Sequence, residues 1–126
     1  METNTIETGK SGENQAAEYL KSLGYKITAQ NWRQGKYEID IIAENEAEIL
    51  FIEVKTRNGF EIPVDRMVRH QQKLNIMKSA NAYITQTKCL KEPRFDLITI
   101  YGVGTNSRLS HIECSFYPTL LSARML

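Results

Sequence analysis

Hydrophobic and polar residues follow two different periods along the chain. From about Ser11 to Leu23, apolar residues recur at the spacing of one helix face, and Gly24 follows as a stop signal. A second apolar stripe of helical period runs from about Arg66 to Thr85. The pattern therefore predicts two amphipathic helices.

The remaining apolar segments are short, as strands are, and polar or glycine-containing turns separate them. They predict five strands, at Tyr25–Arg33, Lys36–Ala43, Glu48–Arg57, Arg94–Tyr101 and Leu109–Phe116. The order α-β-β-β-α-β-β is typical of an α/β (α+β) domain, with a mixed central sheet flanked by helices.

The length of 126 residues is that of one domain, which we expect to span residues 1–126. Cys89 and Cys114 are too far apart in sequence for a metal knuckle or a redox pair, so we expect free thiols. No apolar run is long enough to span a bilayer, and the N-terminus lacks the pattern of a signal peptide. These features predict a cytoplasmic protein with no membrane partner.

The net charge of +1 conceals an asymmetry between the two halves of the chain. Residues 1–63 contain seven basic and eleven acidic residues, a net charge of −4, so the remainder carries +5. Such asymmetry can mark a surface for nucleic acid, although chance produces it more often in a short chain.

The segment Glu48–Arg57 places charge where a core position is expected. Ile49 and Phe51 point to one face of this strand, and Glu53 and Lys55 continue the same face. Charged side chains are seldom buried unless they are paired or bound to a metal.

Asp40 can join this pair, depending on the turn between the two strands. A four-residue loop would place Asp40 directly across from Glu53, whereas a three-residue loop would send it to the other face unless a bulge restores it. Glu13 lies on the buried stripe of the first helix, or is merely an acid favoured by the helix dipole.

Carboxylates this close repel one another, and a shared proton or a cation relieves the repulsion. Oxygen ligands favour a hard cation, so Mg²⁺ (or Mn²⁺) is the expected cofactor. A buried ion-pair network that stabilises the sheet is an equally good interpretation of Asp40, Glu53 and Lys55.

Asp40, followed after twelve residues by Glu53-Val54-Lys55, resembles the motif of the PD-(D/E)xK nuclease superfamily. A longer set of residues resembles the YraN family of small bacterial proteins, over about Gly9 to Phe116. The resemblance is carried by Gly12-Glu13, Gly24-Tyr25, Asn31, Arg33, Glu38-Ile39-Asp40-Ile41-Ile42-Ala43, Phe51-Ile52-Glu53-Val54-Lys55-Thr56-Arg57 and Arg94-Phe95-Asp96.

This resemblance implies a restriction-endonuclease-like fold, binding of nucleic acid with DNA as the first candidate, and a nuclease resembling Holliday-junction resolvases. By position, the metal ligands would be Asp40, Glu53, the Val54 carbonyl and Glu13, and Lys55 would be the catalytic lysine. Gln71 falls at a glutamine common on the second helix of the family. Tyr37 and His70 depart from the family pattern, where a glycine and a lysine are common.

The expected activity is therefore a Mg²⁺-dependent endonuclease, that is, a phosphodiester hydrolase, acting on DNA that includes branched forms. Phosphate contacts are expected from basic residues close in sequence to the motif: Arg57, Arg66, Arg69, Lys73 and Lys78. The resemblance adds Gln71 as a residue that would contact nucleic acid. The alternatives are a non-catalytic nucleic-acid-binding module, and an interaction or assembly protein. In the latter, the apolar segment Leu120–Leu126 would dock a partner or a second copy in a homodimer.

Overall fold

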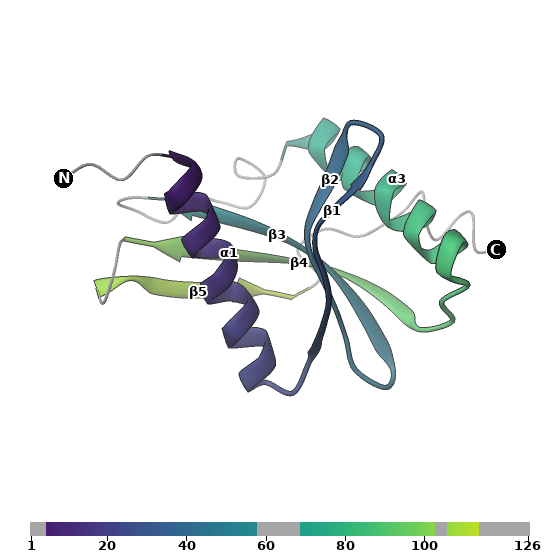
Figure 1. Ribbon diagram of the computed structural model, residues 1–126, viewed down its shortest axis with the longest axis horizontal. Helices are drawn as coiled ribbons and strands as arrows, with labels where there is room; N and C mark the ends of the chain where they lie inside the picture. Colours follow the sequence, from purple (N-terminus) through teal and green to yellow (C-terminus); the bar gives the residue numbers. More distant parts are fainter. Residues whose placement is uncertain (1–4, 58–68, 103–105, 114–126) are drawn as a thin grey trace.

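The apolar segments build one five-stranded sheet with two helices in the computed structural model, which describes residues 5–57, 69–102 and 106–113 (Figure 1). The elements are α1 (Thr5–Ser22), β1 (Lys26–Gln34), β2 (Tyr37–Glu44), β3 (Glu48–Arg57), α3 (His70–Thr87), β4 (Glu92–Tyr101) and β5 (Arg108–Ile112). The predicted mixed α/β class and the order α-β-β-β-α-β-β are confirmed.

The boundaries differ from the prediction mainly at helix ends. α1 begins six residues before Ser11, because an existing helix extends beyond its apolar stripe at little cost. Arg69, predicted inside the second helix, is instead its extended N-cap, with φ −70° and ψ 157°. The last strand ends at Ile112, before Glu113, while the rest of its predicted range lies outside the described residues.

The strands lie in the order β1-β2-β3-β4-β5, and neighbours are antiparallel except for the parallel pair β3 and β4. Glu44 pairs with Ile49, so β2 and β3 have the register of the four-residue loop. This register settles which of the two loop alternatives the chain adopts. It directs Asp40 toward Glu53.

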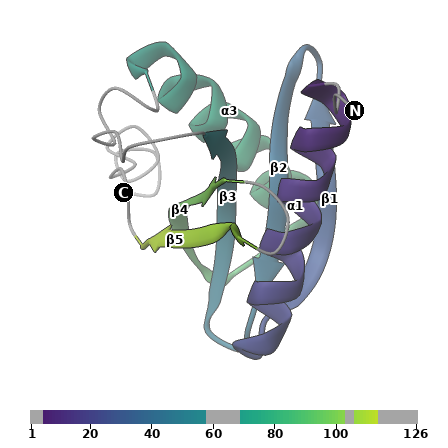
Figure 2. The ribbon, with the colours of Figure 1, turned by 90° about the vertical axis from the view of Figure 1, so that its left-hand side faces the viewer.

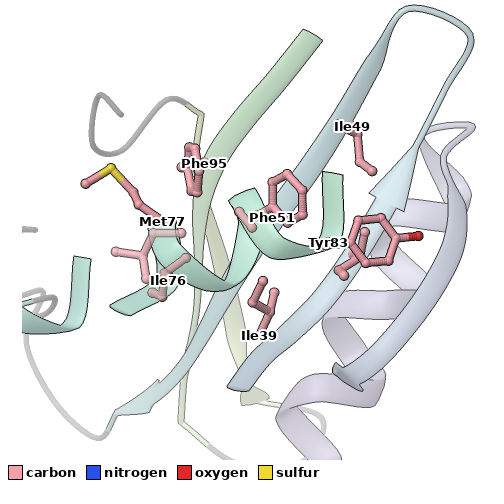
Figure 3. Packing of buried hydrophobic residues seen from close by; sticks show 10 residues of the cluster. Ile39, Ile49, Phe51, Ile76, Met77, Tyr83 and Phe95 are labelled. Carbon is pink, nitrogen blue, oxygen red and sulfur yellow. The ribbon is translucent and has the colours of Figure 1, made fainter. Parts of the chain in front are cut away.

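Each face of the sheet carries its own hydrophobic core. α3 packs on the first face, where Phe51 stacks on Phe95 and meets the edge of Tyr83, with ring centroids 5.5 and 6.0 Å apart (Figure 3). α1 covers the other face, where Leu20 packs with Leu50 and other buried residues (Figure 2). The alternation along β3 assigns its even-numbered apolar residues to α1 and its odd-numbered ones to α3.

β2 and β3 separate partway along their length. Their paired residues run from Glu44 and Ile49 as far as Ile41 and Ile52, and beyond this point the β1–β2 hairpin turns away from β3 (Figure 1). The separation opens a fork between the two strands. Asp40 is the first residue of β2 beyond the paired region.

A second charged cluster lies against α1, away from the fork. Asp96 is fully buried, accepts hydrogen bonds of 2.8, 2.9 and 3.2 Å from the Arg94 guanidinium, and is 2.7 Å from His111 Nε2. His111 Nδ1 in turn lies 2.8 Å from the Tyr19 hydroxyl. This cluster joins α1, β4 and β5.

Arg66, Cys114 and Leu120–Leu126 lie outside the described residues, and so do the expectations that rest on them. Cys89 is a free, half-buried thiol, as predicted. Neither described helix is long and apolar enough to cross a membrane.

Candidate functional site

At the fork, the Asp40 side chain replaces the backbone acceptor that β2 would offer to β3 if the two strands stayed paired. Its Oδ2 accepts a hydrogen bond of 2.8 Å from the Val54 N–H of β3. A side chain thus provides the acceptor for this N–H where the β2–β3 pairing has ended. The contact anchors the Asp40 carboxyl at the sheet.

Glu53 lies beside Asp40, and two side chains, one from its own strand and one from α3, contact its carboxylate. Its Oε1 is 3.0 Å from Lys55 Nζ and accepts a hydrogen bond of 2.9 Å from Gln72 Nε2 of α3. Glu53 is 8% exposed, so its charge is largely removed from water. The predicted shared face of Glu53 and Lys55 is confirmed, and it is the face covered by α3.

Three carboxylates from α1 and β2 meet at the fork. Oxygen atoms of Glu13, Glu38 and Asp40 all lie within 4.8 Å of one another, and each of these residues is half-buried. We refer to them as the carboxylate trio. Glu13 and Asp40 therefore lie together, as predicted, whereas Glu38 was not among the predicted ligands and Glu53 stands next to the trio.

Glu38 reaches the trio because the alternation of faces shifts by one residue within β2. Ile39 and Ile42 both pack in the core beneath α3, although strict alternation would place them on opposite faces. Glu38 therefore does not share a face with Ile42, as strict alternation along β2 would require. The shift lies opposite Asn31, which has a left-handed φ of 52°, although the register of β1 and β2 is the same on either side of it (Gln30 with Ile41, Trp32 with Ile39).

α1 approaches the sheet closely enough to deliver Glu13 because Gly12 has no side chain. A Cβ at Gly12 would lie 2.6 Å from the Thr56 hydroxyl of β3. A close approach of this kind is one that glycine permits. The next residue, Glu13, is thereby placed beside β2.

Burial and mutual repulsion perturb the two central carboxyls. Burial, followed by the negative charge of Glu53, raises the pKa of Asp40 from its ordinary 3.8 to about 7. Burial also raises the pKa of Glu53, although the nearby Lys55 ammonium opposes the shift. Near neutral pH the pair can therefore hold a proton, which is one of the two remedies expected for close carboxylates.

The described residues among those predicted to contact nucleic acid differ in their surroundings, and their role stays a prediction. Arg57 donates to the Thr56 carbonyl at 2.8 Å, and Lys73 is half-buried. Arg69 and Lys78 are exposed. Gln71 is exposed and donates to Asn75 at 3.0 Å, so it is Gln72, missed by the sequence analysis, that reaches Glu53.

The donor set fits a hard divalent cation. The trio offers carboxylate oxygens only, and Mg²⁺ and Mn²⁺ prefer such ligands. Burial first, and then the negative charge of Glu53, raise the pKa of Asp40, and a bound cation would offset both effects. The role predicted for the Val54 carbonyl stays a prediction, since the observed contact to Asp40 uses the Val54 N–H.

Comparison with known proteins gives one consistent family. The family model "Uncharacterised protein family UPF0102" matches residues 12–100. A UPF0102 protein of Bacteroides thetaiotaomicron is 40% identical over 116 residues, covering 90% of this chain and 95% of the relative. A second from Phocaeicola vulgatus is 42% identical with the same coverage, and one from Nitratidesulfovibrio vulgaris is 38% identical over 86% of this chain and 83% of its own. The chain belongs to the UPF0102 (YraN) family.

Proposed function

We propose that the protein is a metal-dependent nuclease that binds DNA and hydrolyses its phosphodiester bonds, with branched DNA among the candidate substrates. The observation that carries this proposal is the convergence of the carboxylate trio beside Glu53 and Lys55. Among the described residues, four acids (Glu13, Glu38, Asp40 and Glu53) gather with two cations, Lys55 and Arg33. A network that served only to stabilise the sheet would more nearly balance its charges, and the excess of carboxylates favours a bound cation.

The trio would hold Mg²⁺ or Mn²⁺, with Glu53 as a further ligand next to Asp40. Such an ion supplies Lewis-acid polarisation of a phosphate oxygen and stabilises charge on the leaving oxygen. Asp40 is positioned for this role by the Val54 N–H, and Glu13 by the close approach at Gly12. The metal site would thus draw on three elements, α1, β2 and β3, that are brought together only in the folded chain.

Lys55 would act on the substrate itself. Its ammonium is half-buried and 3.0 Å from Glu53 Oε1, so it is held beside the carboxylates where a bound phosphate would come. There it would orient the attacking water or stabilise the charge that develops on the phosphate. Gln72 shares the same Glu53 oxygen and would keep that carboxylate in place while Lys55 turns toward the phosphate.

Incubation of the purified protein with linear, nicked, flapped and four-way DNA in Mn²⁺ tests the proposal. We expect cleavage by the wild-type protein and none by Asp40→Ala, prepared in parallel. Cleavage that persists in Asp40→Ala would come from a contaminating nuclease. Binding by the wild-type protein without cleavage of any substrate would refute the enzyme and favour a non-catalytic DNA-binding module.

A further inference from the structure

The tip of the β1–β2 hairpin carries positive charge beside an acidic site. Arg33, Gln34, Gly35 and Lys36 are all exposed, and they include two cations and no acid. Gly35 has φ 63°, which permits the two-residue turn between Gln34 and Tyr37. Figure 1 shows this tip projecting beyond the region where β2 and β3 pair.

Contacts with α3 fix the position of the hairpin. The Trp32 ring meets the edge of the Tyr83 ring, with centroids 5.3 Å apart. Nearer the tip, Gln86 donates a hydrogen bond of 2.9 Å to the Gln34 side chain. These contacts hold the backbone of the hairpin in place, so the two cations at its turn lose less conformational entropy when they bind a ligand.

One of these cations touches the carboxylate trio directly. Arg33 Nη2 lies 3.2 Å from Glu38 Oε2, and the Arg33 side chain is 66% exposed. An exposed ion pair of this kind contributes little in water, so the guanidinium can exchange the carboxylate for a phosphate at small cost. Arginine binds phosphate with two parallel hydrogen bonds, which makes that exchange favourable.

We propose that this hairpin tip, through Arg33 and Lys36, binds the DNA backbone beside the phosphate held at the trio. The inference rests on the proposed function and adds the surface that positions the substrate. Lys36, in the turn just before β2, is four residues from Asp40, which corresponds to roughly 13 Å of extended backbone at about 3.3 Å per residue. This separation is several times the axial rise of about 3.4 Å per base-pair step, so the tip and the trio would contact different phosphates of the same DNA.

The test is DNA binding by Arg33→Gln/Lys36→Gln across a series of salt concentrations. The dissociation constants are measured by fluorescence anisotropy with labelled duplex and four-way DNA. Ca²⁺, which prefers oxygen ligands, is the divalent cation in these measurements. Loss of two phosphate contacts should weaken binding about tenfold or more and reduce the slope of log affinity against log salt by about 1.8. Lys36→Gln alone, which leaves the Arg33–Glu38 pair intact, should remove about half of that slope.

The matched control is Lys21→Gln/Lys26→Gln, which removes the same charge from exposed positions. Lys26 stands at the other end of β1, paired with Glu44, and Lys21 pairs with Glu18 on α1. We expect this control to bind as the wild-type protein does. Equal losses in both double variants, or no loss in either, would overturn the hairpin inference, whereas a wild-type protein that binds no DNA would overturn the proposed function itself.

Discussion

Replacing Asp40 with asparagine should make the protein more stable, although it removes the central acid of the candidate site. The folded state raises the pKa of Asp40 from 3.8 to about 7, so the folded chain binds a proton that the unfolded chain releases. This contribution is fully present below pH 4 and is lost as pH rises through 7. A shift of about three units, at roughly 1.4 kcal/mol per unit, sets an upper bound of about 4 kcal/mol on the loss.

Asparagine avoids that loss because it is neutral at every pH and nearly the same shape. Its carbonyl oxygen can accept from the Val54 N–H, and its amide can donate to Glu53. We therefore expect Asp40→Asn to exceed the wild-type free energy of unfolding by roughly 2–4 kcal/mol at pH 8. The difference should shrink to a small value near pH 4.

Urea unfolding, followed by the fluorescence of the single Trp32, measures these differences at pH 4.5 and pH 8 in EDTA. Added Mg²⁺ at pH 8 should stabilise the wild-type protein, by about 2.7 kcal/mol at one hundred times its dissociation constant, and should leave Asp40→Asn unchanged. Glu46→Gln, which changes an exposed carboxylate in the same way, serves as the control. Asp40→Asn less stable than wild type at pH 8 in EDTA would refute the reasoning.

The other predictions concern neighbouring groups. Gln72→Ala should weaken Mn²⁺ binding and slow cleavage, whereas Gln71→Ala on the next, exposed position should do neither; equal effects in both would contradict a role for the Glu53 contact. Mg²⁺ affinity, measured by calorimetry, should increase by up to tenfold for each unit by which the pH is raised toward about 7, and should be constant above it, because Asp40 must lose its proton before it can bind the ion. Phe51→Ala, in the core beneath α3, should cost about 3–5 kcal/mol in urea unfolding, and a loss below 1 kcal/mol would show that the core closes around the cavity. Asp96→Asn should cost a similar 3–5 kcal/mol, since it leaves the Arg94 guanidinium without its main charge partner; a neutral effect would mean that other acids replace it.

Local pattern predicted much of the site because the strand period is rigid. The apolar run before Glu53 identified a buried strand, and the same alternation placed Lys55 beside Glu53 on the α3 face. The loop length could not be read with certainty from the sequence, so the register of Asp40 stayed open until the pairing of Glu44 with Ile49 was known.

One of the residues that escaped prediction depends on a departure from regular geometry. Glu38 joined the trio because the alternation of faces shifts by one residue within β2, opposite the left-handed Asn31, and no local signal in the sequence predicts such a shift. Gln72, by contrast, follows regular helix geometry: it lies four residues before Ile76, on the face of α3 that packs against the sheet, so the apolar stripe could have identified it.

The Arg94–Asp96 pair could have been predicted from the sequence in the same way as the Glu53–Lys55 pair. The two residues stand two apart at the start of a strongly apolar strand, so they share one face where charge is unexpected. The histidine that contacts Asp96, His111, lies on β5. The composition of that segment is that of an ordinary strand, so the sequence did not indicate this contact.

The cluster around Asp96 has a consequence for the order in which the chain folds. Tyr19 and His111 are 92 residues apart, and so are Gln15 and Ser107, whose side chains also form a hydrogen bond across α1 and the start of β5. The β1–β2–β3 meander, by contrast, pairs residues close in sequence and can form as soon as it is synthesised. We therefore expect the α1–β5 contacts to form as a late event, which on the ribosome must wait until the segment containing β5 has emerged, whereas the packing of Gly12 on β3, which positions Glu13, can form earlier.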